Sequence, residues 1–225
     1  MDTTSRHPYG ATVTSAHQTV PPEALELLKV HRDSFHGAVP FAVATKHPVP
    51  SDTRAWSQIL MSLLTGIPGL GRKKGADLAD GSDVKAANVW QAIDTPRFNG
   101  VLKSGRVGEP GSIACLDGMP FLFLVLWDNE PSGGAERCRV WAVRPRVDAE
   151  FRSMCGDWYA KRDTGEIRSH NFQLHPPRNL DANVIRNTCG NLEYPLLFCA
   201  VWDGTTYQVR TFNPDVLQTG ACRRT

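Results

Sequence analysis

Two stretches near the start of the chain carry apolar residues at helical spacing. The first opens at Pro21-Pro22-Glu23, and Gly37 predicts its end. The second follows a proline-rich loop, with Ser51 or Asp52 available as its capping residue. The apolar stripes are Leu25, Leu27, Leu28 and Phe35 in the first stretch and Trp56, Ile59, Leu60, Leu63 and Leu64 in the second. We therefore expect two amphipathic helices before the first strand.

Strand patterns dominate the later part of the chain. Residues 121–127 form a continuous apolar run, which is typical of a strand buried on both faces, and residues 137–144 predict its neighbour. Asp203-Gly204 is a tight-turn signal between two further apolar stretches. The other predicted elements are strands at 167–174, 194–202 and 205–212 and a helix at 147–162. This order predicts an α/β fold with a mixed central β-sheet flanked by helices.

The remaining segments lack periodicity. Residues 94–118 and 175–193 predict irregular loops, and the polar, Ser/Thr-rich residues 1–20 predict a flexible N-terminal tail. Residues 21–225 are then expected to form a single domain. The chain has 225 residues, of which 41% are hydrophobic, and this is enough to build a buried core.

The segment around Asp80-Gly81 holds the candidate chemistry. This pair predicts a tight turn, and the strands that it joins are expected at 72–79 and 82–90. Because side chains alternate faces along a strand, Asp83 and Lys85 share one face. Asp77 lies on the incoming strand, close enough to join them. Asp80 serves better as the turn residue than as part of the group.

Two convergent carboxylates and a lysine can bind a divalent cation and orient a water molecule beside it. Asp77 and Asp83 supply the oxygen ligands that Mg²⁺ prefers, and Lys85 can orient a water beside them. This equipment suits phosphodiester hydrolysis. The alternative is that all three are exposed hairpin residues in ordinary ion pairs, worth under about 1 kcal/mol each.

The same residues resemble a nuclease signature. Asp77, followed by Asp83-Val84-Lys85, is similar to the D…(D/E)-x-K motif of the PD-(D/E)XK superfamily. Ala76 stands where that pattern commonly has Pro, and Asp83 stands where Glu is more frequent. The wider sequence looks like type II restriction endonucleases, with a MamI-like subgroup as the narrower suggestion. This wider resemblance covers roughly residues 53–215, including 56–60, 96–99 and 170–178.

The resemblance implies a sequence-specific, Mg²⁺-dependent endonuclease for double-stranded DNA, acting as a homodimer on a palindromic site. Asp77 and Asp83 with the carbonyl of Val84 would hold the metal, and Lys85 would assist the water. Enzymes of this fold often carry an acidic residue on the preceding helix, where this chain offers Gln58. We expect Gln58 to pack or face solvent, with a hydrogen bond to the site as the alternative.

Two polar stretches are candidates for contacting DNA. Arginine recognises guanine edges and asparagine recognises adenine, although most such residues hold phosphates or sugars. The candidates are Arg97 and Asn99 in the first stretch and Arg168, His170, Asn171, Gln173, His175, Arg178, Arg186 and Asn187 in the second. A solvated loop without DNA contacts is the alternative for the second stretch.

The bulk properties narrow the setting. The formal net charge is only +2, so nucleic-acid contacts must come from a local basic face. No apolar run reaches membrane-spanning length, and the first residues lack the apolar region of a secretory signal. The six cysteines include no C-x-x-C pair, so we expect free thiols in a reducing cytoplasm and no membrane partner.

Other functions stay open at this point. The chain could be a nicking or structure-specific DNA repair nuclease of the same fold. It could also be a non-catalytic DNA-binding module, or an unrelated α/β protein whose motif match is accidental.

Overall fold

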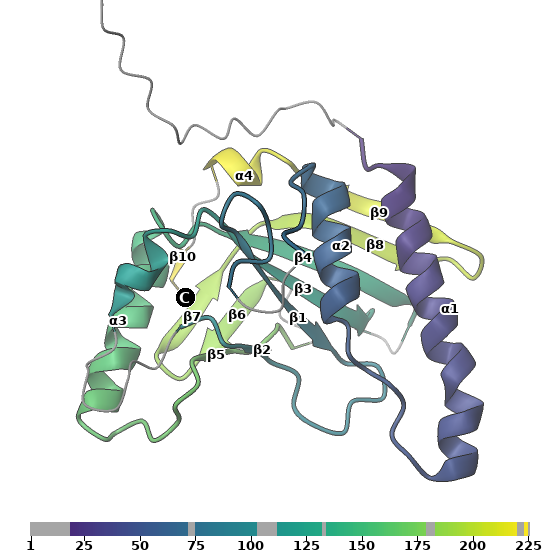
Figure 1. Ribbon diagram of the computed structural model, residues 1–225, viewed down its shortest axis with the longest axis horizontal. Helices are drawn as coiled ribbons and strands as arrows, with labels where there is room; N and C mark the ends of the chain where they lie inside the picture. The colour runs from purple at the N-terminus through teal and green to yellow at the C-terminus, as the bar shows by residue number, and fades with distance from the viewer. Residues whose placement is uncertain are drawn as a thin grey trace, which may run out of the picture.

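A five-stranded mixed sheet forms the centre of the molecule (Figure 1). The computed structural model describes residues 19–71, 75–102, 112–131, 134–178, 183–219 and 223–224, so the predicted tail at 1–20 lies almost wholly outside the described residues. The strands, in spatial order, are β1 (Asp83–Asn88), β3 (Leu122–Asn129), β4 (Glu136–Val143), β8 (Leu196–Trp202) and β9 (Tyr207–Phe212). β1 runs parallel to β3 and the other neighbours are antiparallel, which confirms the predicted mixed sheet.

The apolar run of β3 places a core on each face of the sheet. Leu122, Leu124 and Leu126 belong to one hydrophobic cluster, whereas Phe123 and Trp127 belong to the other. Strand alternation alone produces this division, because successive side chains point to opposite faces. A strand that is apolar at nearly every position is therefore stable only at the centre of a sheet covered on both sides.

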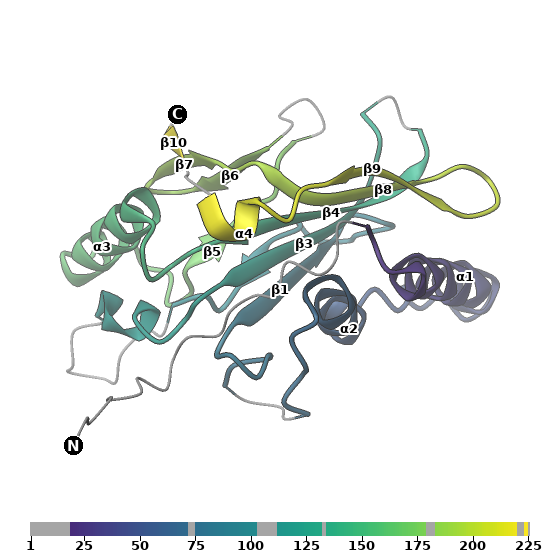
Figure 2. The same cartoon turned by 90° about the horizontal axis from the view of Figure 1, so that it is seen from above.

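Helices cover the two faces. α1 (Pro22–Thr45) and α2 (Arg54–Thr65) lie together on one face, and α3 (Ala149–Asp163) packs on the other (Figure 2). The side chain of Asp148 caps α3 by accepting from the N–H of Phe151, as expected at a helix start. No helix among the described residues is long and apolar enough to cross a membrane.

The first helix continues well beyond its predicted end at Gly37. It passes through Gly37 and Pro40 and ends at Thr45, followed by Lys46 in the left-handed conformation with φ 59°. Phe35 and Ala42 are both buried on the same side of the helix, two turns apart. Packing on either side of Gly37 and Pro40 thus outweighs their weak helix propensity.

The predicted hairpin at 72–79 and 82–90 does not form in the part of it that the structure describes, from residue 75 onward. β1 pairs in parallel with β3, and among the described residues before β1 a single antiparallel bridge joins Gly69 and Leu78. The turn itself is present, since the N–H of Gly81 donates to the carbonyl of Leu78 at 3.1 Å. Local sequence thus encodes the turn. The fully apolar β3 supplies the partner for β1, and only the tertiary fold reveals it.

Small strands were underestimated in the polar segments. The predicted loop at 94–118 contains β2 (Phe98–Asn99) and a 3₁₀ helix (Ile113–Leu116), and the predicted strand at 167–174 shrinks to β5 (Gln173–Leu174). The predicted irregular stretch at 175–193 contains the hairpin of β6 (Val184–Asn187) and β7 (Gly190–Glu193). Only Ile185 and Leu192 of that hairpin are fully buried, so its apolar pattern is too sparse to recognise. The remaining short elements are α4 (Val216–Thr219) and β10 (Arg223–Arg224).

Candidate active site

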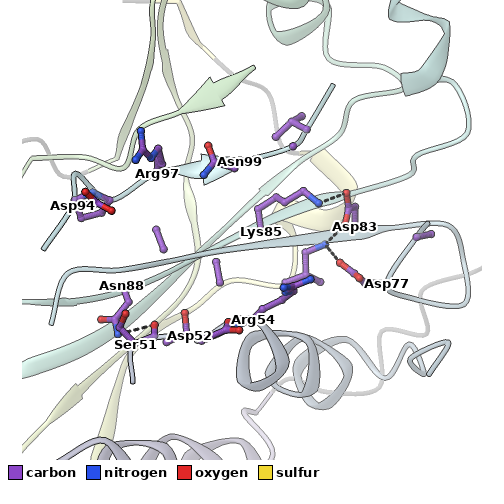
Figure 3. A pocket seen from close by; sticks show the side chains of 18 of the residues that line it. Ser51, Asp52, Arg54, Asp77, Asp83, Lys85, Asn88, Asp94, Arg97 and Asn99 are labelled. Atoms are coloured by element: carbon purple, nitrogen blue, oxygen red, sulfur yellow. Dashed lines mark hydrogen bonds and ion pairs between the residues drawn. The ribbon is translucent and has the colours of Figure 1, made fainter. Parts of the chain in front are cut away.

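An open cleft of about 960 Å³ runs beside the edge strand β1. One wall is formed by Asp52 at the end of the α1–α2 connection and by Arg54 at the start of α2, and the opposite wall carries Arg97 and Asn99 around β2 (Figure 3). Between the walls, the cleft is lined by β1 and by Asp77. A cleft with charged groups on both sides and carboxylates between them can hold an extended, charged polymer.

The predicted trio does converge on this cleft. Lys85 Nζ lies 2.7 Å from Asp83 Oδ2, as expected for two residues on the same face of a strand. The main-chain N–H of Val84 donates to both carboxylates, at 2.9 Å to Asp77 Oδ2 and 3.0 Å to Asp83 Oδ1. The Val84 side chain points away and is only 2% exposed, within the core beneath α2. The geometry on which the proposed chemistry depends is therefore present, although no hairpin builds it.

Asp80 is used for the turn. Its Oδ1 accepts from the N–H of Ser82 at 2.9 Å, and its Oδ2 accepts from the Ser82 hydroxyl at 2.8 Å. Ser82 also accepts from the N–H of Phe121, which ties the turn to the start of β3. Gly81 has φ 96°, and a Cβ there would lie 2.9 Å from the carbonyl oxygen of Gly118. Glycine is required at this corner, and the corner delivers Asp83 to the cleft.

Gln58 joins the site from α2. Its Nε2 donates to Asp77 Oδ1 at 2.7 Å. The hydrogen bond was the less favoured of the two roles expected for this residue. Asp77 therefore receives one donor on each oxygen, from Gln58 and from Val84.

The Asp77 carboxyl has an unusual proton affinity. Burial, followed by its hydrogen-bonding contact with Asp83, raises the pKa of Asp77 to about 6. The N–H of Val84 and the charge of Lys85 oppose this rise in the pKa. Two carboxylates held this close repel one another when both are ionised, and a divalent cation between them would relieve that repulsion.

The donor set fits a hard divalent cation with an incomplete protein shell. Among the described residues, no group of three or more His, Cys, Asp and Glu side chains gathers to bind a metal. Mg²⁺ usually takes only one or two carboxylates and fills its remaining positions with water and phosphate. Asp77 and Asp83 at the edge of an open cleft match that pattern, whereas a closed structural zinc site would need four protein ligands.

The predicted DNA-contacting residues separate into three groups. Arg97 and Asn99 line the cleft. Gln173 pairs with Asn99 across β2 and β5, His175 bridges to Arg186, and Asn187 bonds to Gln173, so these four are connected to the cleft wall through β5. Burial and the nearby Arg186 lower the pKa of His175. The exposed candidates outside the cleft lining are Arg168, His170, Asn171 and Arg178.

Two of these candidates make internal hydrogen bonds. Arg186 Nη2 donates to the carbonyl of Pro176 at 2.9 Å, and Asn187 Nδ2 donates to the carbonyl of Gln173 at 2.7 Å. These bonds attach the β6–β7 hairpin to β5. DNA contacts by this second stretch stay predictions.

Arg54 was missed by sequence reasoning. It is the first residue of α2, it is exposed, and its side chain extends toward the carboxylates in Figure 3. Its N–H is anchored by Asp52 Oδ1 at 2.9 Å, and no ion partner for its guanidinium is found among the described residues. Its place within three residues of the predicted caps Ser51 and Asp52, on the helix that precedes the acids, was the available signal.

Comparisons with known proteins converge on one group. The MamI restriction endonuclease family matches residues 40–200, a range that contains the whole cleft. The type II restriction enzyme MamI of Microbacterium ammoniaphilum is 35% identical over 166 residues, covering 68% of this chain and 53% of the relative. The chain thus spans about half the length of the curated relative that it matches. No solved structure matches the chain.

Proposed function

The chain belongs to the MamI restriction endonuclease family, and from this premise we propose that it is a sequence-specific, Mg²⁺-dependent endonuclease that hydrolyses phosphodiester bonds in double-stranded DNA. The observation that carries the proposal is the convergence of Asp77, Asp83 and Lys85 on an open cleft. The family range includes all three residues.

Each residue of the trio has a distinct part in the proposed reaction. Asp77 and Asp83, with the main-chain carbonyl of Val84, hold the cation. Bound Mg²⁺ supplies charge neutralisation at the phosphate and a water of lowered pKa. Lys85 has three N–H donors, of which one is satisfied by Asp83 in the free protein. The other two orient the attacking water and approach a phosphate oxygen.

The cleft walls hold the DNA backbone in this proposal. Arg54 and Arg97 stand on opposite walls, and neither has an ion partner among the described residues. A duplex phosphate is the natural counter-charge for such guanidinium groups. Asn99, which lines the cleft, and the exposed residues before β5 would make further contacts along the duplex. A homodimer would present two such clefts to the two strands of a palindromic site.

The direct test is digestion of mixed plasmids in Mg²⁺, followed by sequencing of the ends. We expect discrete fragments that share a short sequence at each cut. Nicks or cleavage confined to branched DNA would instead favour a repair nuclease, and intact DNA would favour a non-catalytic binding module.

Two substitutions test the trio within that assay. Asp83→Ala and Lys85→Ala should each lower the cleavage rate by about 1,000-fold, as expected when a group that stabilises charge in the transition state is lost. Specific DNA binding in Ca²⁺ should persist. Lys161→Ala is the matched control, because it removes an ion pair of 3.0 Å between Lys161 on α3 and Glu166 just after that helix, and it should leave cleavage unchanged. Normal cleavage by either cleft variant would reject the assignment.

A further inference from the structure

The orientation of Asp77 depends on a residue from another element. Asp83 is held by Lys85, its neighbour on the same strand. Asp77 lies in the segment before β1 and has no such neighbour on a strand. Its Oδ2 accepts from Val84, and its Oδ1 accepts from Gln58 on α2, which lies 19 residues earlier in the chain. The two carboxylates of the cleft are thus positioned by different means.

α2 is firmly placed against the sheet. Ser57, next to Gln58, is fully buried, and its hydroxyl accepts from the indole N–H of Trp127 on β3 at 3.0 Å. Leu60 and Met61 are also fully buried in the core beneath the helix. A side chain that projects from so well anchored a helix can set the orientation of a carboxylate on a neighbouring loop.

We propose that Gln58 is a positioning residue for the cation site: its amide N–H fixes the Asp77 carboxylate so that the remaining lone pairs of Asp77 face the cleft beside Asp83. The inference rests on the proposed function. An amide is suited to this task because it donates without adding charge, so the site keeps two carboxylates and one lysine. Partners that orient a metal-binding carboxylate commonly change metal affinity or activity by 10- to 100-fold when they are removed.

Gln58→Met tests the idea, since methionine has nearly the same length and helix propensity but cannot donate. The chain offers a matched control in Gln208 on β9, the edge strand opposite β1. Its Nε2 donates to Asp203 Oδ2 at 2.9 Å. We expect Gln58→Met to weaken Ca²⁺ or Mn²⁺ binding, measured by calorimetry without DNA, by about 10-fold or more. In Mg²⁺, kcat for cleavage should fall with KM for DNA nearly unchanged. Gln208→Met should alter none of these quantities.

The outcomes separate the two proposals. If Gln58→Met binds the cation and cleaves as the unmodified protein does, Gln58 is a packing residue and this inference is wrong, while the nuclease assignment stands. If the unmodified protein neither binds the cation nor cleaves DNA, both proposals fail together. If the circular dichroism spectrum of Gln58→Met shows that this variant does not fold, the same binding and cleavage measurements are made on Gln58→Ala, because alanine favours the helix and adds no bulk.

Discussion

At the scale of single residues, the main-chain N–H of Val84 is shared between both carboxylates of the cleft. One amide hydrogen cannot satisfy two carboxylates fully, so each acid has a second donor, Lys85 for Asp83 and Gln58 for Asp77. The contact between Asp83 and Lys85 was predictable, because residues two positions apart on a strand lie on the same face. The contact between Gln58 and Asp77 was expected only as the less favoured alternative for Gln58, because it joins a helix to a loop that only the tertiary structure brings together.

His31 provides a residue-scale prediction about acid stability. It is 4% exposed among Trp56, Trp90 and Trp127, and burial lowers its pKa from 6.5 to about 4. Between these pH values the unfolded chain binds a proton that the folded protein rejects. The free energy of unfolding is therefore fully retained above pH 6.5 and decreases as the pH falls toward 4.

Urea denaturation checks this prediction. The loss of stability between neutral pH and about pH 4.5 should be smaller by roughly 2 kcal/mol in His31→Phe than in the unmodified protein. His47→Gln, at an exposed position, is the control and should leave the pH dependence unchanged. An identical pH dependence in His31→Phe and the unmodified protein would contradict the assignment.

At the scale of elements, α1 shows where local rules give way to packing. Gly37 and Pro40 are ordinary signals for a helix end, yet the helix runs through both. The prediction of β6 and β7 failed for the opposite reason, because their two buried positions are too few to produce a visible pattern. β3, β4 and the β8–β9 hairpin were predicted well, since each carries enough apolar residues to define its own burial.

Pro40→Ala should stabilise the protein. Proline lacks the N–H that would donate to the carbonyl of His36, and the position is exposed, so alanine restores a helical hydrogen bond without steric cost. We expect the free energy of unfolding to rise by about 1 to 2 kcal/mol, after allowing for the greater freedom of the unfolded alanine chain. Chemical denaturation measures the change. Pro22→Ala, at the first turn where proline is tolerated, should change stability far less. Destabilisation by Pro40→Ala would mean that the helix needs the proline.

At the scale of the whole molecule, charge is sparse and local. A net charge of +2 gives no general attraction to DNA, so the proposed binding would depend on the cationic groups around the cleft. The cleft combines residues from the α1–α2 connection, β1 and β2, which no reading of a single segment could assemble. The sequence motif located the acids and the lysine. The fold added Arg54 and favoured the hydrogen-bonding role of Gln58 over the packing role.

Arg54→Ala should weaken DNA binding uniformly across sequences. If Arg54 neutralises one phosphate, the slope of log affinity against log salt should decrease by about 1. Titrations of labelled duplex in Ca²⁺ at several salt concentrations measure that slope. Arg210→Ala is the matched control, because Arg210 is exposed on β9 at the far edge of the sheet from β1. Equal slopes for Arg54→Ala and the unmodified protein would exclude a phosphate contact.

The parallel alignment of β1 with β3, Asp83 opposite Leu122 and Lys85 opposite Leu124, has one more consequence. A shift of this strand by a single position would move Asp83 and Lys85 into the hydrophobic core beneath α2 and would turn the Val84 side chain toward the cleft. Such a misaligned strand would remove Asp83 and Lys85 from the cleft and would destabilise the fold. The proposed cation site therefore forms only together with the correct register of β1 on β3.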